Sequence, residues 1–224
     1  MINLLLEGYD LALPYLRNEL KQIIHPGHKV AAVAFAFRDS KVRTAADWRR
    51  LYGKDHGKYY AGIANGFTAY GVSENDIVFV NYFEDTKESA RKKIENADIV
   101  YFPGGLPDRM MERIEEFGLT DILRNHDGII MGYSAGAVIQ LREYHLSPDE
   151  DYPGFAYYNG LGYLDGFYHE VHYEGTSIQK ASIERVLKER GGKVYATRYM
   201  QGTILVEDGK VRLLGDVEVF GDVH

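Results

Sequence analysis

The sequence predicts an α/β fold in which a mainly parallel sheet is covered by helices on both faces. Short apolar or β-branched runs alternate with amphipathic stretches along the chain, which is typical of such folds. The 224 residues are 45% hydrophobic, enough to bury one substantial core. We therefore expect a single α/β domain over residues 1–224.

The first half of the chain alternates between predicted strands and helices. The apolar runs predict strands at Ile2 to Leu6, Val30 to Phe35, Ile77 to Phe83 and Ile99 to Phe102. Capping and stop residues predict four helices. The first follows Asp10, with Pro14 in its first turn, and the fourth begins at Thr86. Between them, one helix runs from Thr44 to Gly53 and another from about Tyr59 to Gly71. Near the C-terminus, Asp208-Gly209 indicates the turn of a hairpin over residues 202–215.

Composition argues against several classes of function. The net charge is −7 and the cations are interspersed with acids, so no basic face is expected to bind nucleic acid. The apolar N-terminal run reaches Glu7 after a few residues, which is too short for a signal peptide or a membrane span, and we expect a cytoplasmic protein. Because the chain has no cysteine, disulfides, a thiolate nucleophile and thiolate metal ligands are excluded.

The most informative motif is Gly132-Tyr133-Ser134-Ala135-Gly136, which lies between the apolar runs 128–131 and 138–141. This order predicts a strand, a sharp turn and a helix. Small residues on both sides of Ser134 let the backbone bend tightly and hold the hydroxyl up at the end of the sheet, as in a nucleophile elbow. The alternative is a glycine-rich turn whose serine caps the helix.

A second glycine-containing turn, with Gly104 and Gly105, follows the strand that ends at Phe102. Its backbone N–H groups are expected at the carboxyl ends of the parallel strands, where ligands of open α/β sheets bind. An acyl-transfer serine needs two donors aimed at the developing oxyanion. We expect Ala135 to supply one and Gly104 or Gly105 the other, the alternative being a plain turn between strand and helix.

A serine nucleophile also needs a histidine as its general base. Among the eight histidines, His172 closes the alternating run 166–172, which predicts a strand that ends just before Glu174-Gly175. Catalytic groups collect at such strand ends. A metal site is not expected, because His169 and His172 would face opposite sides of a strand and no third ligand has a recognisable spacing.

Taken together, these residues resemble the serine peptidase family of aspartyl dipeptidase (peptidase E) and cyanophycinase. The resemblance covers most of the chain and rests on the Gly104-Gly105 loop, the elbow at 132–137, His172-Tyr173 and the closing hairpin. It implies a three-layer sandwich like that of class I glutamine amidotransferases, with a C-terminal β-hairpin. It also implies a Ser-His-acid triad for the hydrolysis of small peptides, without a cofactor, in which Ser134 is the nucleophile and His172 the general base.

The acid of the triad is the least determined member. The resemblance places it between the serine and the histidine, at Asp149 in Ser147-Pro148-Asp149-Glu150-Asp151. Glu150 and Asp151 remain open through a slip of one or two residues. Three consecutive acids also describe a solvated turn.

One departure from the family concerns the substrate. Aspartyl dipeptidase has an arginine shortly after the catalytic histidine, whereas this chain has none between Tyr173 and Glu184. Strict preference for an N-terminal aspartate is therefore not expected. Lys180 is the candidate replacement as a point charge, and Tyr173 and Tyr158 are further candidate substrate contacts. The long segment 38–66 and the aromatic residues between 152 and 158 are expected either to wall the crevice or simply to pack.

We therefore expect a serine hydrolase, monomeric or homodimeric, that acts on small peptides. A noncatalytic member of the same fold, binding a small acidic metabolite or a partner at the elbow, is the alternative from a different class. An esterase or amidase would use the same residues.

Overall fold

The computed structural model describes residues 1–221. Its strands are β1 (Ile2–Leu6), β2 (Val30–Val33), β3 (Ile77–Val80), β4 (Ile99–Phe102), β5 (Ile129–Tyr133), β6 (Glu143–Leu146), β7 (Ala156–Asn159), β8 (Phe167–Glu170), β9 (Lys193–Glu207) and β10 (Lys210–Gly221). Its helices are α1 (Pro14–Ile23), α2 (Ala45–Tyr52), α3 (Tyr60–Thr68), the 3₁₀ turn η1 (Glu74–Asp76), α4 (Lys87–Glu95), α5 (Pro107–Glu116), α6 (Thr120–Arg124), α7 (Ala135–Val138) and α8 (Ser177–Arg190).

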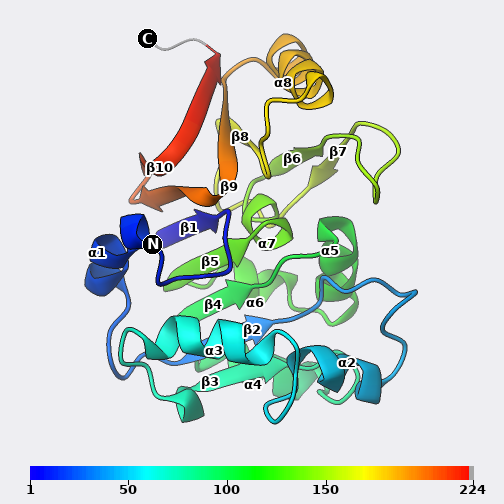
Figure 1. Ribbon diagram of the computed structural model, residues 1–224. Helices are drawn as coiled ribbons and strands as arrows, with labels where there is room; N and C mark the ends of the chain where they lie inside the picture. The colour runs from blue at the N-terminus through cyan, green and yellow to red at the C-terminus, as the bar shows by residue number, and fades with distance from the viewer. Residues whose placement is uncertain (222–224) are drawn as a thin grey trace.

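The central sheet is mixed and mostly parallel, as the sequence predicts (Figure 1). Its order is β10-β9-β1-β5-β4-β2-β3, with β8 paired to β9, and β1 to β5 run parallel to one another. The C-terminal hairpin is confirmed: β9 runs antiparallel to both β1 and β10. Asp208 and Gly209 both have positive φ at its turn, 48° and 77°, as a tight two-residue hairpin turn requires. The fold is thus an α/β sandwich with an added hairpin.

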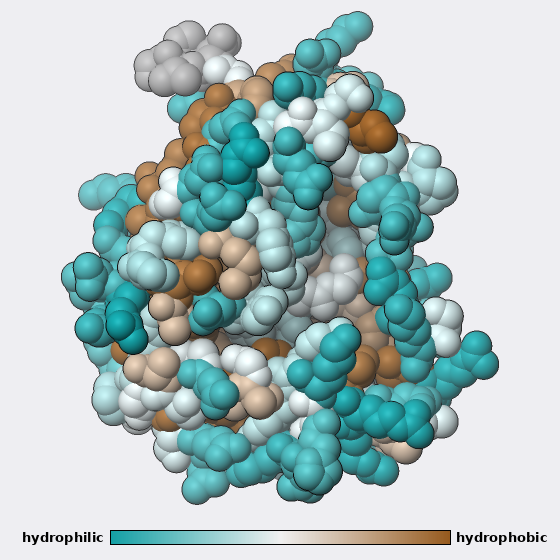
Figure 2. All heavy atoms as spheres, viewed as in Figure 1, coloured by the Kyte–Doolittle hydropathy of each residue, from teal (hydrophilic) through white to brown (hydrophobic). Residues whose placement is uncertain are grey.

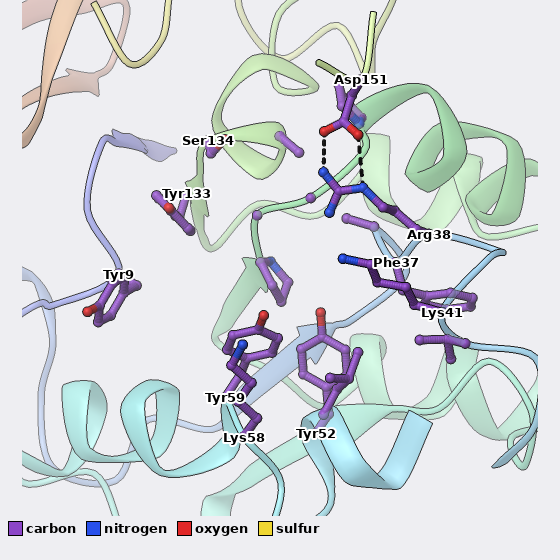
Figure 3. A pocket seen from close by; sticks show the side chains of 18 of the residues that line it. Tyr9, Phe37, Arg38, Lys41, Tyr52, Lys58, Tyr59, Tyr133, Ser134 and Asp151 are labelled. Carbon is purple, nitrogen blue, oxygen red and sulfur yellow. Dashed lines mark hydrogen bonds and ion pairs between the residues drawn. The ribbon is translucent and has the colours of Figure 1, made fainter. Parts of the chain in front are cut away.

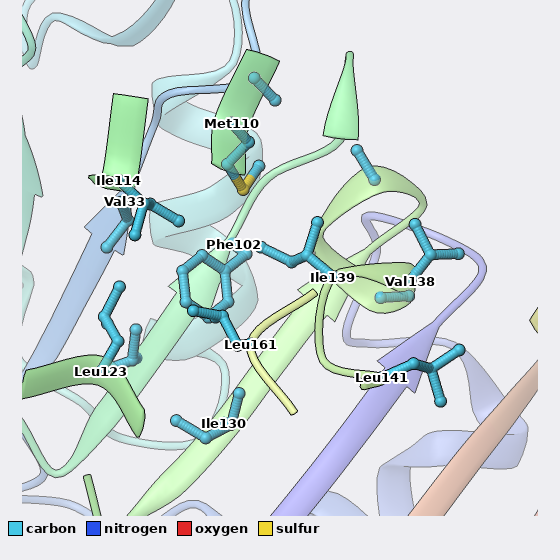
Figure 4. Packing of buried hydrophobic residues seen from close by; sticks show 14 of the residues in the cluster. Val33, Phe102, Met110, Ile114, Leu123, Ile130, Val138, Ile139, Leu141 and Leu161 are labelled. Atoms are coloured by element: carbon cyan, nitrogen blue, oxygen red, sulfur yellow. The ribbon is translucent and has the colours of Figure 1, made fainter. Parts of the chain in front are cut away.

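Successive residues of the central strands face opposite helix layers. On β1, Leu5 packs in the cluster that contains side chains of α4, α5, α6 and α7, whereas Leu4 and Leu6 pack with those of α1, α2 and α3. Figure 4 shows the first cluster, in which Phe102 from β4 lies among side chains that include Met110 of α5. Because strand side chains alternate in direction, a strand buried on both faces reads as a continuous apolar run.

Several element boundaries follow from the residues that predict them. Thr44 and Thr86 both cap helices as expected, each accepting a hydrogen bond from the backbone N–H three residues later. The first helix begins later than expected, at Pro14, because Asp10 accepts the N–H of Ala12 in a local turn and does not cap the helix. The strand predicted to reach His172 ends at Glu170.

No helix within residues 1–221 has both the length and the apolar character that crossing a bilayer requires.

Removing the ring of Phe102 should destabilise the fold strongly. Phe102 is fully buried between the sheet and the helices on one face, so Phe102→Ala should lower the free energy of unfolding by about 3–5 kcal/mol, measured by urea denaturation. Leu213 on β10 is 37% exposed, and Leu213→Ala should cost less than about 1 kcal/mol. Equal losses in the two variants would contradict this account of the core.

Candidate active site

A pocket of about 860 Å³ opens where the parallel strands end. It is lined by residues that follow β1, β2, β4 and β5, including Tyr9, Phe37, Gly104 and Ser134. In Figure 2 this face of the molecule is hollowed near its centre, with hydrophilic residues around the hollow. The carboxyl edge of a parallel sheet is the usual place for a ligand site in an open α/β fold.

Ser134 lies at the predicted elbow, directly between β5 and α7. Its backbone has φ 53° and ψ −110°, a conformation that a residue with a side chain adopts only when its surroundings enforce it. The flanking glycines explain how the bend is possible: a Cβ at Gly132 would lie 1.9 Å from the carbonyl oxygen of Gly136, and one at Gly136 would lie 2.0 Å from that of Phe102. The tight corner therefore places the serine in the wall of the pocket.

The structure brings His172 to this serine. Ser134 Oγ lies 2.8 Å from His172 Nε2, within hydrogen-bond distance. His172 follows β8 with a positive φ of 51°, and its backbone is held on both sides, because its N–H donates to Glu7 Oε1 at 2.8 Å and its carbonyl accepts from Gln179 Nε2 at 2.9 Å. Its second ring nitrogen, Nδ1, contacts Glu7 Oε1.

Glu7 is the carboxylate that orients the imidazole, and sequence reasoning did not find it. It is 0% exposed and follows β1, one residue beyond the Leu6 carbonyl that accepts the N–H of Ser134. Its other oxygen, Oε2, accepts from Thr197 Oγ1 of β9 at 2.7 Å. The signal that could have found it is an acid immediately after an apolar strand, at the edge of the sheet where sites form.

These bonds continue through β9 to a second histidine. Because the Thr197 hydroxyl donates to Glu7, it accepts from His169 Nε2, 2.7 Å away. Burial lowers the pKa of His169 to about 3, so its ring is neutral at physiological pH. A single chain of hydrogen bonds therefore joins His169, Thr197, Glu7, His172 and Ser134.

The pKa values of Glu7 and His172 depend on their burial and on their contact with each other. Burial raises the pKa of Glu7, although the hydrogen bonds from His172 and Thr197 oppose that shift. Burial alone would lower the pKa of His172, but the hydrogen bond and the negative charge of Glu7 outweigh it, and the net shift is upward. The imidazolium that would form on proton transfer from the serine is thus stabilised by Glu7.

Asp149 does not occupy the position predicted for the acid. Its Oδ1 accepts the backbone N–H groups of Asp151 and Tyr152, both at 2.8 Å, which fixes it in the turn after β6. Asp151 pairs with Arg38 across the pocket instead, with Arg38 Nε 2.9 Å from Asp151 Oδ1 (Figure 3), and Glu150 is exposed. None of these carboxylates hydrogen-bonds His172, because a different strand end supplies its partner.

The predicted oxyanion donors lie beside the serine. Gly104 packs against Tyr133 and Ser134, where a Cβ would lie 2.7 Å from the Tyr133 ring. The N–H groups of Gly104, Gly105 and Ala135 donate no hydrogen bond to any of residues 1–221. They are therefore available to a bound substrate at the pocket wall.

The three predicted substrate contacts do not reach the pocket. Lys180 is exposed on α8, and Tyr173 is buried against Ile183 and Val194, where its ring packs on Phe220. Tyr158 stacks on Tyr144 with ring centroids 5.6 Å apart. These side chains stabilise the α8 and β6–β7 regions. By contrast, the segment 38–66 does wall the pocket, and Tyr152 joins it there.

In the part of the chain that the structure describes, no three His, Asp or Glu side chains are arranged so that they could hold a metal ion. His169 and His172 take different partners, Thr197 and Glu7.

Comparisons with known proteins identify the family and similar folds. Residues 51–214 match the family model of "Peptidase family S51". A crystal structure of a peptidase E candidate from Listeria monocytogenes EGD-e is similar in fold, with a TM-score of 0.66 and 15% identity over 95% of this chain and 96% of that one. A peptidase from an acI-B1 actinobacterium has a TM-score of 0.54 and 16% identity over 99% and 87%. Curated protein sequences give no significant match.

The contact with Glu7 should be visible in the titration of His172. Glu7→Gln removes the charge that holds the pKa up, so His172 should titrate at lower pH than in the wild type, measured by NMR of its ring protons. Asp149→Asn is the matched control: Asp149 also acts on His172 through charge but makes no hydrogen bond to it, so the shift should be smaller. A larger pKa shift in Asp149→Asn than in Glu7→Gln would assign the orienting carboxylate to Asp149.

Proposed function

The chain belongs to peptidase family S51, and from this we propose that it is a serine-type peptidase that hydrolyses small peptides through Ser134, His172 and Glu7. The observation that carries the proposal is the 2.8 Å contact between Ser134 Oγ and His172 Nε2, with Glu7 on the opposite ring nitrogen. This is the arrangement of a nucleophile, a general base and an orienting acid. Glu7 lies outside the residues matched by the family model.

Each group then has a defined chemical task. His172 Nε2 takes the proton as Ser134 Oγ attacks the scissile carbonyl, and Glu7 fixes the tautomer that keeps Nε2 free to accept it. The carbonyl oxygen becomes an oxyanion, for which Ala135 and the Gly104-Gly105 turn offer N–H donors. His172 returns the proton to the leaving amine, and a water then hydrolyses the acyl-serine by the same steps.

The upward pKa shift of His172 sets the expected pH dependence. Only the neutral imidazole can accept the serine proton, so activity should rise with pH through the pKa of His172, which Glu7 holds above its ordinary value. Removing the Glu7 carboxylate would move this rise in activity to lower pH. It would also lower the maximal rate, because the imidazolium of His172 loses its counter-charge.

A fluorophosphonate probe tests the triad without knowledge of the substrate. Wild type should be labelled at Ser134, and Ser134→Ala should not be. His172→Ala and Glu7→Gln should lower the labelling rate by about 10²-fold or more, because triad members act as a unit. Asp149→Asn should stay within about threefold of wild type, since Asp149 is bonded within its own turn.

Two outcomes would contradict the proposal. Absence of labelling at any pH would favour a noncatalytic protein that binds at the elbow. Labelling without cleavage of any member of a random di- and tripeptide pool, with turnover of simple esters or amides, would assign the same residues to an esterase or amidase.

A further inference from the structure

The pocket extends well beyond the serine, onto a wall formed by the connection between β2 and α3. Lys41 and Lys58 both line this wall (Figure 3). Neither lysine forms an ion pair with any carboxylate among residues 1–221, although the Nζ of Lys58 lies 5.0 Å from the centroid of the Tyr59 ring. Two ammonium groups without counter-ions therefore face one cavity.

The other charges of the pocket largely neutralise one another. Arg38 pairs with Asp151, and Arg50 pairs with Asp47 at 2.8 Å. The remaining carboxylate that lines the pocket is Asp149, which is held by two backbone N–H groups of its own turn after β6. The unpaired positive charge thus lies on the wall formed by the connection between β2 and α3.

Two tyrosines, Tyr52 and Tyr59, line the same wall as these lysines. In Figure 3 the hydroxyls of Tyr52 and Tyr59 point into the pocket, and the Lys58 ammonium lies over the Tyr59 ring. The Tyr52 ring is buried, and its hydroxyl has no hydrogen-bond partner among residues 1–221. Burial also raises the pKa of Tyr52, so the hydroxyl stays protonated and can donate. The Tyr52 hydroxyl is not among the sealed, unsatisfied polar atoms of residues 1–221, and Tyr52 lines the pocket, so a bound ligand can accept its hydrogen bond in place of water.

We propose that Lys41, Lys58, Tyr52 and Tyr59 form an anion subsite that holds a carboxylate of the substrate away from the scissile bond. The proposal rests on the peptidase function, because a peptide brings a carboxylate as its anionic group. Ammonium and phenol donors together suit a carboxylate, and the charge-assisted bonds are the stronger ones. The carboxylate is either the free C-terminus of a short peptide or an acidic side chain.

Anion binding can be tested independently of catalysis. Glutarate should bind saturably to Ser134→Ala, read by the fluorescence of Trp48, the single tryptophan, whose ring lies 5.3 Å from that of Tyr52. Glutaramide, its neutral analogue, should bind at least tenfold more weakly. Tyr52→Phe, Lys41→Met and Lys58→Met should each weaken glutarate binding about threefold or more, at constant ionic strength.

Lys54→Met is the matched control, because Lys54 is an exposed lysine of the same connection that does not line the pocket. It should leave glutarate binding unchanged. Equal binding of glutarate and glutaramide, or equal weakening by Lys54→Met and Lys58→Met, would overturn the subsite. The peptidase proposal would survive that result if fluorophosphonate still labels Ser134.

Peptide pools then identify the source of the carboxylate. Random tripeptides whose carboxylates are all unmodified should be cleaved. The double variant Lys41→Met/Lys58→Met should raise their KM at least tenfold, while its rate of labelling by fluorophosphonate stays within about twofold of wild type. Loss of cleavage on C-terminal amidation would assign the subsite to the C-terminus. Loss on replacing Asp and Glu by Asn and Gln would assign it to a side chain. Undiminished cleavage of peptides that carry both changes, and so have no carboxylate left, would overturn the proposal.

Discussion

The geometry of the site depends on one buried carboxylate. Glu7 has no exposed surface, and an ion so buried is tolerated only when its hydrogen bonds are satisfied. It receives three: from the Nδ1 and the backbone N–H of His172, and from the Thr197 hydroxyl. Because two of these bonds come from the same residue, Glu7 fixes both the backbone and the ring of His172. The position of Nε2 against Ser134 follows from this double attachment.

Backbone strain is concentrated around the contact of Glu7 with His172. Of the four non-glycine residues with positive φ among residues 1–221, Ser134 and His172 form the central contact, and Met200 adjoins Tyr199, whose ring packs 5.6 Å from that of His172. The fourth, Asp208, lies in the hairpin turn. Each such conformation costs of order 1–3 kcal/mol and persists only where packing and hydrogen bonds enforce it. Here the close approach of Gly132 to Gly136 and the bonds of Glu7 supply that enforcement.

The sequence predicts what depends on local pattern and fails where a contact joins distant segments. The strands β1 and β4, the caps at Thr44 and Thr86 and the turn at Asp208-Gly209 depend on nearby residues, and the structure confirms them. The orienting carboxylate could not be derived in this way, because Glu7 meets His172 across 165 positions of sequence. The family resemblance places the acid at Asp149, between the serine and the histidine, but the sheet places the end of β1 beside the end of β5. Lys180 and Tyr173 are predicted contacts because they follow His172 closely in sequence, and Tyr158 because it belongs to an aromatic-rich segment, but none of the three lines the pocket.

The two parts of the site are held in the fold in different ways. Ser134, His172 and Glu7 stand at strand ends whose positions are set by the sheet and by mutual hydrogen bonds. The wall with Lys41 and Lys58 belongs to a connection whose lysines are exposed and make no ion pair within residues 1–221. Exposure keeps the cost of leaving two like charges unpaired small, and a bound anion would remove it. Under the proposed function, substitutions on this wall would therefore change which peptide binds without disturbing the groups that would cleave it.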